Sequence, residues 1–470
     1  MTLAWLAACT ASTDGPSTPT TPAPVPPAPP IAASCAPQPA DDESGDPEAL
    51  RFWCDVQLAE AAPVEVAFAP VDGSRPERVH RSDAPALDHR VGLYLMAADT
   101  DYAWTARVPG TDLAVSGTLT TGPLPEDVAF TWDAAGAPST GLLGFIAPCN
   151  GAYVAILDPA TGAVLWYRTF RSTGVSWVEA ATFTDDGTVL VIAGRSIVEV
   201  DPMGLERLRI DPGPALTEHL HHDLVRADGL TYTLFDEEIR VRDRGYLVDG
   251  FLEHDAAGNR VAEWHLADHV DVSGTASPYA DNDFSHANAI QVDDQRRVWL
   301  SLRLLDAIVR VDGDPSSPTF GEIQARIAHP GSRIGPDWTV VDATVTATGG
   351  PEDPSGFVAQ HDLQLRPDGT VTVFDNRRDV GTSSGVTLSL DEPTRTATIT
   401  ERYPIDQHCD YQGANRRTPT GNPLLTCAPA REVTELDAAT GATVWSATLT
   451  CSDGFGSFVP RFVPLDGWPG

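Results

Sequence analysis

Apolar residues along this chain fall in short runs, and clusters of Gly, Pro, Asp and Asn separate one run from the next. The runs are rich in Val, Ile, Thr and aromatic residues, a composition typical of β-strands. After the first few residues, no run approaches the roughly 20 apolar residues that a membrane-spanning helix needs. The pattern predicts an all-β protein made of many short strands.

A small β unit is expected over residues 50–125. Its strand-like runs read VEVAFAP, HRVGLYLM and DYAWTARV, and the unit closes with VSGTLTTGPLP. This order, with the Tyr102-x-Trp104 strand before the closing segment, resembles a fibronectin-type sandwich. We therefore predict a small β-sandwich, which at this size usually serves as a spacer or a binding module.

An internal repeat runs from about residue 128 to residue 470. Each copy has a turn of the Asp-Gly or Gly-Asn type, a strand, a second turn, and a strand that often ends in Trp. The first strands read TVLVIAG (188–194), LTYTLFDE (230–237), VWLSLR (298–303), TVTVFDNR (370–377) and PLLTCAP (423–429). We count six copies over roughly 340 residues. Such units suit propeller blades, because each blade buries its faces only against its neighbours. We predict a six-bladed β-propeller over residues 128–470, in preference to a sandwich or a β-helix.

Three copies of the repeat carry a histidine at nearly the same place, seven or eight residues before the hairpin turn. The motifs are HHDLVRADG (221–229), SHANAIQVDD (285–294) and QHDLQLRPDG (360–369). Equivalent positions in successive blades are related by rotation, so the starts of the innermost strands converge on the mouth of the channel. A single histidine is more often structural. Three in register indicate a shared site formed by His222, His286 and His361.

The hairpins bring further polar residues to the same level. Folding 286–292 against 298–303 returns Arg303 to His286, and Asn288 shares the strand face of His286 because the strand period is two. The hairpin after His361 returns Asn376 and Arg377 in the same way. We expect Asn288, Asn376 and Arg377 to bind the substrate. Arg303 is expected to belong to the catalytic group with the histidines.

Two aspartates follow their histidines directly and should therefore point to the opposite face of the strand. They are Asp223 and Asp362, which we interpret as structural anchors. Other blades place Glu179 and Asn415 near the site.

The expected site contains three imidazoles and at least one guanidinium, with no carboxylate clearly on the same face. Such a site suits a tetrahedral oxyanion such as sulfate or phosphate. Arginine supplies a planar fork of donors that is always charged. Cationic neighbours lower histidine pKa values below about 6.5, so one imidazole can stay neutral at pH 7 and act as a nucleophile. The neighbouring arginine argues against a metal ion, and we predict neither a metal site nor a cofactor.

The charge of the chain limits the kinds of partner that it can bind. The formal net charge is −35, and every basic residue other than histidine is arginine. This charge argues against nucleic acid and anionic membrane surfaces as partners. The acidity is consistent with solubility or with a saline medium. An anionic substrate is repelled at long range, so its site must concentrate positive charge locally.

The N-terminus indicates export. Residues 1–9, MTLAWLAAC, end in a small-residue run before Cys9 that resembles a bacterial lipobox, which predicts lipidation of Cys9. A chance run of small residues is the alternative, and the missing basic region would place the true start of the signal upstream. Residues 10–47 are rich in Ser, Thr and Pro and predict a disordered tether. We expect a lipoprotein of the periplasm or cell surface, anchored in the outer membrane.

The remaining six cysteines are an even number, as disulfides in an oxidising compartment require. Fifteen pairings are possible. Order along the chain favours Cys35–Cys54, Cys409–Cys427 and Cys149–Cys451, and no spacing is typical of a zinc site.

Several of these segments together resemble the bacterial arylsulfate sulfotransferase family. The segments are HHDLVRADG, FSHANAI followed by SLR, QHDLQLRPDG followed by FDN, GANRRTPTGNPLL and TELDAATGATVW. The resemblance extends from about residue 60 to the end. It implies a six-bladed propeller that moves a sulfuryl group from one phenol to another without a nucleotide sulfate donor.

The resemblance also implies roles for the shared histidines. His361 matches the histidine that the family sulfurylates transiently. His222, His286, Asn288 and Arg303 match the residues that hold the sulfuryl oxygens, and either of the two other histidines would protonate the leaving phenolate. The partners would then be a small phenolic donor and acceptor. The oligomeric state stays open, with a homodimer as one possibility.

Two rival functions use the same residues. One is a propeller without catalysis that serves as a surface binding or scaffold lipoprotein. The other is a metal-dependent propeller lyase or hydrolase.

Overall fold

The structure, a computed structural model, describes residues 30–39, 48–146, 153–170, 177–213, 216–272, 282–344, 356–377, 381–451, 459–465 and 468. Within these ranges β-strands joined by turns and loops make up the chain, with very little helix. The helical pieces described there are short 3-10 turns at Glu126–Val128, Leu266–Asp268 and Arg303–Leu305. The predicted all-β class is confirmed.

The N-terminal unit is one five-stranded antiparallel sheet. Its strands are β1 (Ile31–Gln38), β2 (Glu48–Pro70), β3 (Arg78–Leu93), β4 (Asp101–Arg107) and β5 (Ala114–Thr120). The long strand β2 pairs with β3 on one side, and with β1 and then β4 on the other. The sheet packs around a core that includes Phe52, Val66 and Trp104. The strands that we expected to form a sandwich therefore all belong to one sheet, because β2 pairs with β1, β3 and β4.

Strand β1 lies inside residues 10–47, where we predicted a disordered tether. It pairs with β2, with Cys35 opposite Cys54, and a disulfide joins these two residues. Ile31 enters the core of the unit. The tether prediction is wrong for residues 31–38, because pairing, a disulfide and apolar burial together order a segment whose composition is typical of a linker.

Six further sheets of four or five strands make up the rest of the described chain. Three consist of consecutive strands: β10 (Val178–Phe183), β11 (Val189–Ala193), β12 (Ser196–Val200) and β13 (Glu206–Ile210); β14 (His219–Ala227), β15 (Leu230–Val241), β16 (Arg244–His254) and β17 (Arg260–His265); β18 (Ala287–Val292), β19 (Arg297–Leu302), β20 (Ala307–Asp312) and β21 (Ile323–Ala328). The fourth contains β23 (His361–Leu365), β24 (Val371–Asp375), β25 (Ser384–Asp391) and β26 (Thr396–Pro404), with β22 (Thr339–Asp342) parallel to β26.

The last two sheets close the ring with strands from distant parts of the chain. One is β27 (Ala414–Arg417), β28 (Pro423–Cys427), β29 (Glu432–Leu436) and β30 (Thr443–Cys451), with β6 (Phe130–Gly136) added beside β30. The other is β7 (Leu143–Ile146), β8 (Tyr153–Leu157) and β9 (Val164–Thr169), with β31 (Phe462–Pro464) added beside β7. The ring is thus closed twice, once at its outer edge and once at its centre.

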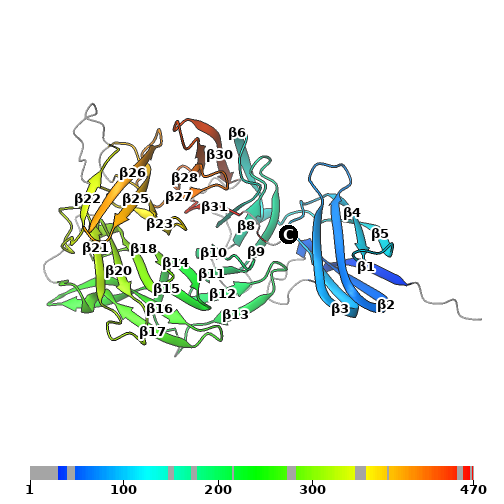
Figure 1. The fold of residues 1–470 in the computed structure, drawn as a ribbon, viewed down its shortest axis with the longest axis horizontal. Coiled ribbons are helices and arrows are strands. Elements are labelled where there is room, and N and C mark those ends of the chain that lie inside the picture. The colour runs from blue at the N-terminus through cyan, green and yellow to red at the C-terminus, as the bar shows by residue number, and fades with distance from the viewer. Residues whose placement is uncertain are drawn as a thin grey trace, which may run out of the picture.

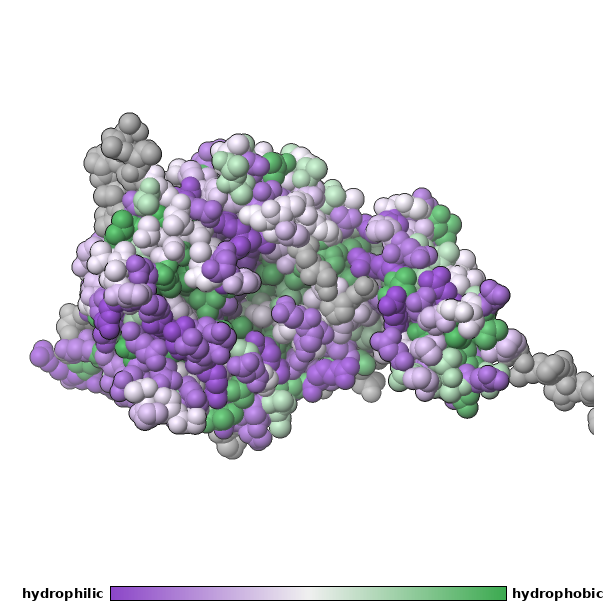
Figure 2. All heavy atoms as spheres, in the orientation of Figure 1, coloured by the Kyte–Doolittle hydropathy of each residue, from purple (hydrophilic) through white to green (hydrophobic). Residues whose placement is uncertain are grey.

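Figure 1 shows the six sheets arranged as blades around a centre, with β10, β14, β18, β23, β27 and β31 nearest to it. The predicted six-bladed propeller is confirmed. The surface is hollowed over the centre of the ring (Figure 2).

The N-terminal unit docks on the blade that contains β8 and β9 (Figure 1). Arg51 is buried, and its guanidinium donates to the Tyr167 carbonyl at 2.8 Å and lies 5.5 Å from the Trp166 ring centroid. Arg75 pairs with Asp158 at 3.4 Å.

Two of the predicted disulfides are described, Cys35–Cys54 and Cys409–Cys427. Cys451 is also disulfide-bonded, but its expected partner Cys149 lies outside the described residues, as does Cys9 with the proposed lipobox. Disulfides fit an oxidising compartment outside the cytoplasm. In the part of the chain that the structure describes, no helix is long and apolar enough to cross a membrane.

Candidate active site

The inner strands of three blades are irregular where the histidines lie. The pairing register shifts between Leu220 and Leu224 in β14, between Ala287 and Ala289 in β18, and between His361 and Gln364 in β23. Such bulges redirect side chains and are frequent next to active sites.

Backbone conformation marks the same places. His222 and His286 have positive φ angles of 58° and 50°, and Ala359 and Asp362 on either side of His361 both have φ of 54°. Residues other than glycine rarely adopt this region. The local backbone therefore turns these imidazoles away from the regular strand face.

His222 and His286 come together directly. Their ring centroids lie 4.8 Å apart, with the rings nearly perpendicular. His222 and His361 line one small pocket together with Glu179 and Asn288. Burial lowers the pKa of His222 well below its usual value, and the neighbouring histidines add to the effect. The three histidines from three blades thus share one environment.

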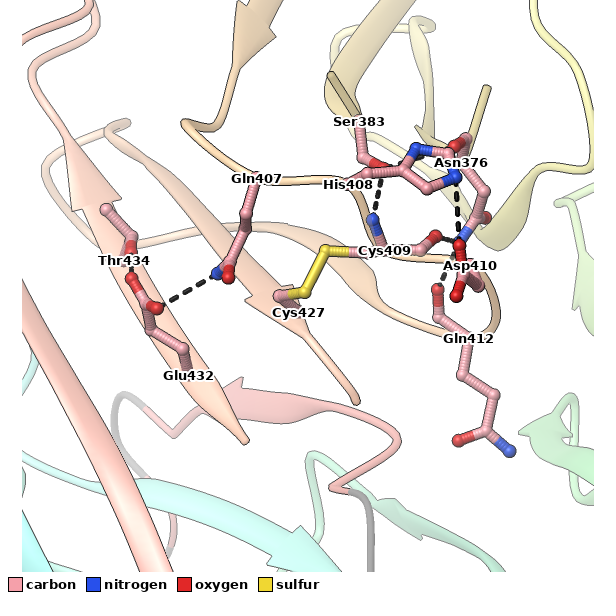
Figure 3. Close-up of a disulfide and its surroundings, with 10 residues drawn as sticks. All are labelled: Asn376, Ser383, Gln407, His408, Cys409, Asp410, Gln412, Cys427, Glu432 and Thr434. Carbon is pink, nitrogen blue, oxygen red and sulfur yellow. Dashed lines mark hydrogen bonds and ion pairs between the residues drawn. A yellow bond between two sulfur atoms is a disulfide. The ribbon is translucent and has the colours of Figure 1, made fainter. Parts of the chain in front are cut away.

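The tautomer of His361 follows from Asn376. The Nδ2 group of Asn376 donates to the carbonyls of Cys409 and Gln412, both at 2.7 Å (Figure 3). The Oδ1 atom of Asn376 therefore faces His361 and accepts its Nδ1–H at 2.8 Å. The lone pair of His361 then lies on Nε2, which accepts the backbone N–H of Gln412 at 3.2 Å. Asn376, predicted to bind substrate, orients His361 instead.

His361 is held neutral by its surroundings. Its imidazole is buried, and burial lowers its pKa well below the usual range; the charges of Arg303 and His286 lower it further. A neutral imidazole with a lone pair on Nε2 is a nucleophile.

His286 has a carboxylate partner that the sequence analysis missed. Its Nδ1 lies 2.5 Å from Asp283 Oδ2. Asp283 stands three residues before His286 and outside any strand, so strand periodicity does not predict which way it points.

Arg303 and Asn288 are near the histidines, as the hairpin argument predicted. The backbone N–H of Arg303 donates to the His286 carbonyl at 3.1 Å, and its charge acts on His361. Asn288 donates from Nδ2 to the Gln360 carbonyl at 2.8 Å. Its buried Oδ1 has no partner among the described residues and Asn288 lines the pocket.

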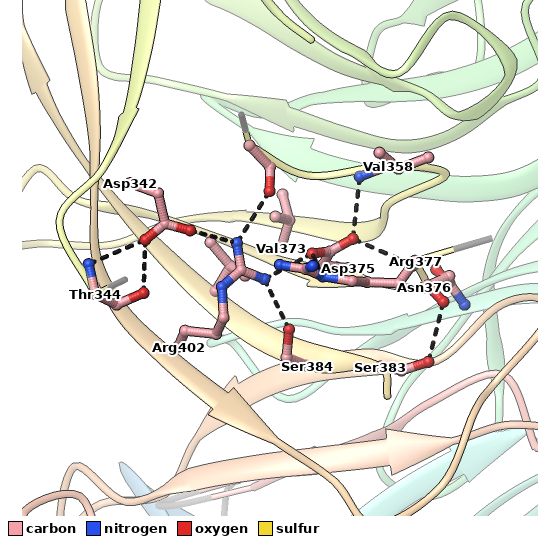
Figure 4. A network of polar contacts seen from close by, with 12 residues as sticks. Asp342, Thr344, Val358, Val373, Asp375, Asn376, Arg377, Ser383, Ser384 and Arg402 are labelled. Atoms are coloured by element: carbon pink, nitrogen blue, oxygen red, sulfur yellow. Dashed lines mark hydrogen bonds and ion pairs between the residues drawn. The ribbon is translucent and has the colours of Figure 1, made fainter. Parts of the chain in front are cut away.

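Arg377 differs from our expectation. Its Nε pairs with Asp375 Oδ2 at 3.1 Å, and Asp375 also pairs with Arg402 at 2.7 Å (Figure 4). Arg377 is not among the residues that line the pocket. The buried Asp375 carboxylate holds the guanidinium there, so the structure does not bring Arg377 into the pocket with the histidines.

A buried arginine that the sequence analysis missed lies between the two aspartates. Arg461 pairs with Asp223 at 2.9 Å and with Asp362 at 3.7 Å, and it donates to the His222 carbonyl at 3.0 Å. It also lines the pocket. Arg461 stands just before the closing strand β31, where no repeated motif marks it.

Asp223 and Asp362 also join neighbouring blades. Asp223 accepts the backbone N–H of Ile290, and Asp362 accepts that of Asn415, both at 3.0 Å. These contacts agree with our interpretation of the two residues as structural anchors. Asp362 nevertheless lines the same pocket as His361, so the expectation that it points to the opposite face is wrong, because its positive φ and the bulge in β23 break the alternation of the strand.

The pocket admits only a small group. Its cavity volume is about 20 Å³, which is room for one water molecule. Its walls carry two imidazoles and the Arg461 guanidinium, which suit an oxyanion, but also the carboxyl groups of Glu179 and Asp362, although the sequence analysis expected no carboxylate clearly on this face. Within the described ranges, no group of three or more His, Cys, Asp or Glu side chains is arranged to hold a metal ion.

Solved structures with similar folds share little sequence with this chain. A protein of unknown function from Bacteroides caccae is 13% identical, with a TM-score of 0.43, and the match covers 69% of this chain and 99% of that one. A catalytically inactive virginiamycin B lyase from Staphylococcus aureus is 10% identical, with a TM-score of 0.36 and coverage of 70% and 90%. The WD40 domain of Pan2 from Neurospora crassa is 10% identical, with a TM-score of 0.35 and coverage of 69% and 87%. No curated protein matches this chain.

A family model gives a more specific result. The model described as arylsulfotransferase (ASST) matches residues 145–410, more than half of the chain. The match includes His222, His286, Arg303 and His361. The chain therefore belongs to the arylsulfotransferase family.

Proposed function

We propose that this protein transfers a sulfuryl group from a phenolic sulfate ester to a phenol through a sulfo-histidine at His361. The observation that carries the proposal is the tautomer of His361. Asn376 fixes the proton on Nδ1 and leaves the lone pair on Nε2, in a pocket shared with cationic and imidazole donors. A nucleophile with its lone pair directed at an anion site is what a covalent transfer needs.

In the first step, Nε2 of His361 attacks the sulfur of the donor. The new N–S bond forms as the S–O bond to the phenol breaks. The leaving phenolate takes a proton from a neighbouring imidazole, and we assign this role to His222. The Gln412 N–H now occupies the lone pair of Nε2, so the donor must displace it before attack.

In the second step, the oxygen of the acceptor phenol attacks the sulfur. The N–S bond breaks, His361 is restored, and the phenol proton returns to the imidazole that gave one up. Three oxygens stay bonded to the sulfur in each step. Arg303, Arg461 and His286 stabilise the negative charge on these oxygens. Preorganised donors of this kind are typically worth 10²–10³ in rate each.

The experiment is a transfer assay with 4-nitrophenyl sulfate, with and without added phenol, that follows nitrophenolate absorbance and phenyl sulfate formation. We expect release that depends on phenol. His361→Ala should abolish both release and transfer, because no covalent intermediate can form. His265→Ala, on the outer strand β17, is the matched control and should keep wild-type activity.

Enzyme quenched with donor alone should carry one sulfuryl group on the peptide that contains His361. A label on His222 or His286 would move the nucleophile, and full activity in His361→Ala would refute the mechanism. Release that requires an added metal ion would favour a metal-dependent lyase or hydrolase. No release at all would favour a binding or scaffold protein.

A further inference from the structure

The residue before His222 is a histidine with unusual contacts. His221 is buried, and its Nε2 lies 3.0 Å from Asp249 Oδ1 on β16. Its Nδ1 lies 2.8 Å from Nδ1 of His222. The two imidazoles and the carboxylate form a chain that leads from the interior of the blade to the pocket.

Asp249 is held as a carboxylate. The Ser285 hydroxyl and the Ala287 N–H, at 2.8 Å, both donate to its Oδ2. These bonds and that from His221 keep the pKa of Asp249 below its usual value although burial acts to raise it. The Nε2 atom of His221, which lies beside this carboxylate in an ion-pair contact, therefore carries a proton.

Only one proton fits between the two Nδ1 atoms. Burial acts to lower the pKa of His221, but the bond to Asp249 and its charge raise it overall, whereas the pKa of His222 is well below its usual value. The shared proton thus belongs to His221. The Nδ1 of His222 accepts it, so the proton that His222 itself carries is on Nε2.

Other charged and titratable groups also act on this pair. Asp236 and Glu179 act on His221, and His286, His361 and Arg461 act on His222. The first two favour a charged His221, and the other three favour a neutral His222. All of them therefore stabilise the same distribution of protons.

The equivalent positions in the other two blades do something different. They hold Ser285 and Gln360, which are buried and bond to the preceding blade, Ser285 to Asp249 on β16 and Gln360 to Ser301 on β19 and to the Ala307 carbonyl on β20. Among the three motifs, the residue before the site histidine is titratable only in HHD. A purely structural role would not require this difference.

We propose that His221 and Asp249 are positioning residues that supply and recover the proton exchanged by His222. The inference rests on the proposed sulfuryl transfer. When the first phenolate leaves, the Nε2 proton of His222 passes to its oxygen and the Nδ1 proton of His221 passes to His222. His221 becomes neutral and keeps its bond to Asp249. The acceptor phenol then gives its proton to Nε2 of His222, and the Nδ1 proton returns to His221.

The test compares donors with different leaving groups. Phenolate from phenyl sulfate is strongly basic, since the pKa of a phenol is about 10, and its departure needs a proton. Nitrophenolate is a much weaker base and leaves with little help. We expect His221→Gln and Asp249→Asn to lose about 10²-fold or more in kcat/KM with phenyl sulfate, the usual worth of a general acid. With 4-nitrophenyl sulfate the loss in kcat/KM should be smaller than this by a factor of about ten or more.

The thermal stability of the two variants and of the His265→Gln control should be measured first, so that activities are compared only among folded proteins. If one variant fails to fold, the other still provides the test. Equal losses with both donors, or no loss with either, would overturn the proton role. Absence of phenol-dependent transfer in the wild type would instead overturn the proposed function itself.

Discussion

At the scale of single residues, burial lowers the pKa of several histidines. Neighbouring charged groups either add to this effect or reverse it. Asp249 raises the pKa of His221 against the effect of burial, whereas burial lowers the pKa values of His222 and His361 well below their usual range. His80 in the N-terminal unit is also neutral, because burial lowers its pKa to about 4. Its Nδ1–H donates to the Gly92 carbonyl at 2.7 Å, and its buried Nε2 has no partner in the described structure.

His80 should make the N-terminal unit sensitive to acid. Its folded pKa is about 4 and its unfolded value about 6.5, so the unfolded state binds more protons between these values. The contribution to stability is fully present above pH 6.5 and falls as the pH drops toward 4, by about 3 kcal/mol at most. His80→Gln cannot titrate. Urea unfolding at pH 7 and pH 4.5 should show a smaller loss in this variant; equal losses would contradict the prediction.

Sequence reasoning found the residues that recur and missed those that do not. His222, His286 and His361 stand at one place in a repeat, so rotation of the blades brings them together. Arg461 belongs to no motif, and Arg377 has its direction decided by the buried Asp375. Such contacts depend on the tertiary structure and leave no periodic signal.

At the scale of elements, the inner strands are fastened to one another by buried carboxylates. Asp362 accepts the Asn415 N–H of the next blade and the Arg416 Nε at 2.9 Å, and it faces Arg461. The order of the blades was predictable from the repeat, because each hairpin is local. The strand β1 was not predicted, although its disulfide Cys35–Cys54 was, because its pairing with β2 leaves no signal in the composition of residues 31–38.

Asp362→Asn should destabilise the propeller by about 3 kcal/mol, because removing one partner leaves buried guanidinium groups uncompensated. Glu392→Gln is the control. Glu392 pairs with Arg310, but its side chain is 52% exposed, so this change should cost less than about 1 kcal/mol. Chemical unfolding of both variants measures the difference. Similar costs would show that the buried carboxylate does not fasten the blades.

At the scale of the whole molecule, a net charge of −35 surrounds a site that takes up an anion under the proposed function. Repulsion at long range slows the approach of a charged donor but not that of a neutral phenol. Salt screens this repulsion over about 10 Å at 0.1 M.

Added sodium chloride should therefore raise kcat/KM for an aryl sulfate, by about tenfold at most between very low and physiological ionic strength. The KM for phenol at saturating donor should stay constant. Steady-state assays over a salt series measure both values. A decrease for the sulfate would mean that the local positive charge of the site extends beyond the pocket and dominates the approach.

The double closure of the ring has a consequence for how activity begins. Arg461 bridges Asp223 and Asp362 from the segment that leads into β31, while β6 closes the other edge from the beginning of the propeller. A nascent or clipped polypeptide that stops before residue 461 lacks this bridge even if every histidine motif is present. Under the proposed function we therefore expect incomplete chains to be inactive, and sulfuryl transfer to begin only once β31 has paired with β7 in the last blade.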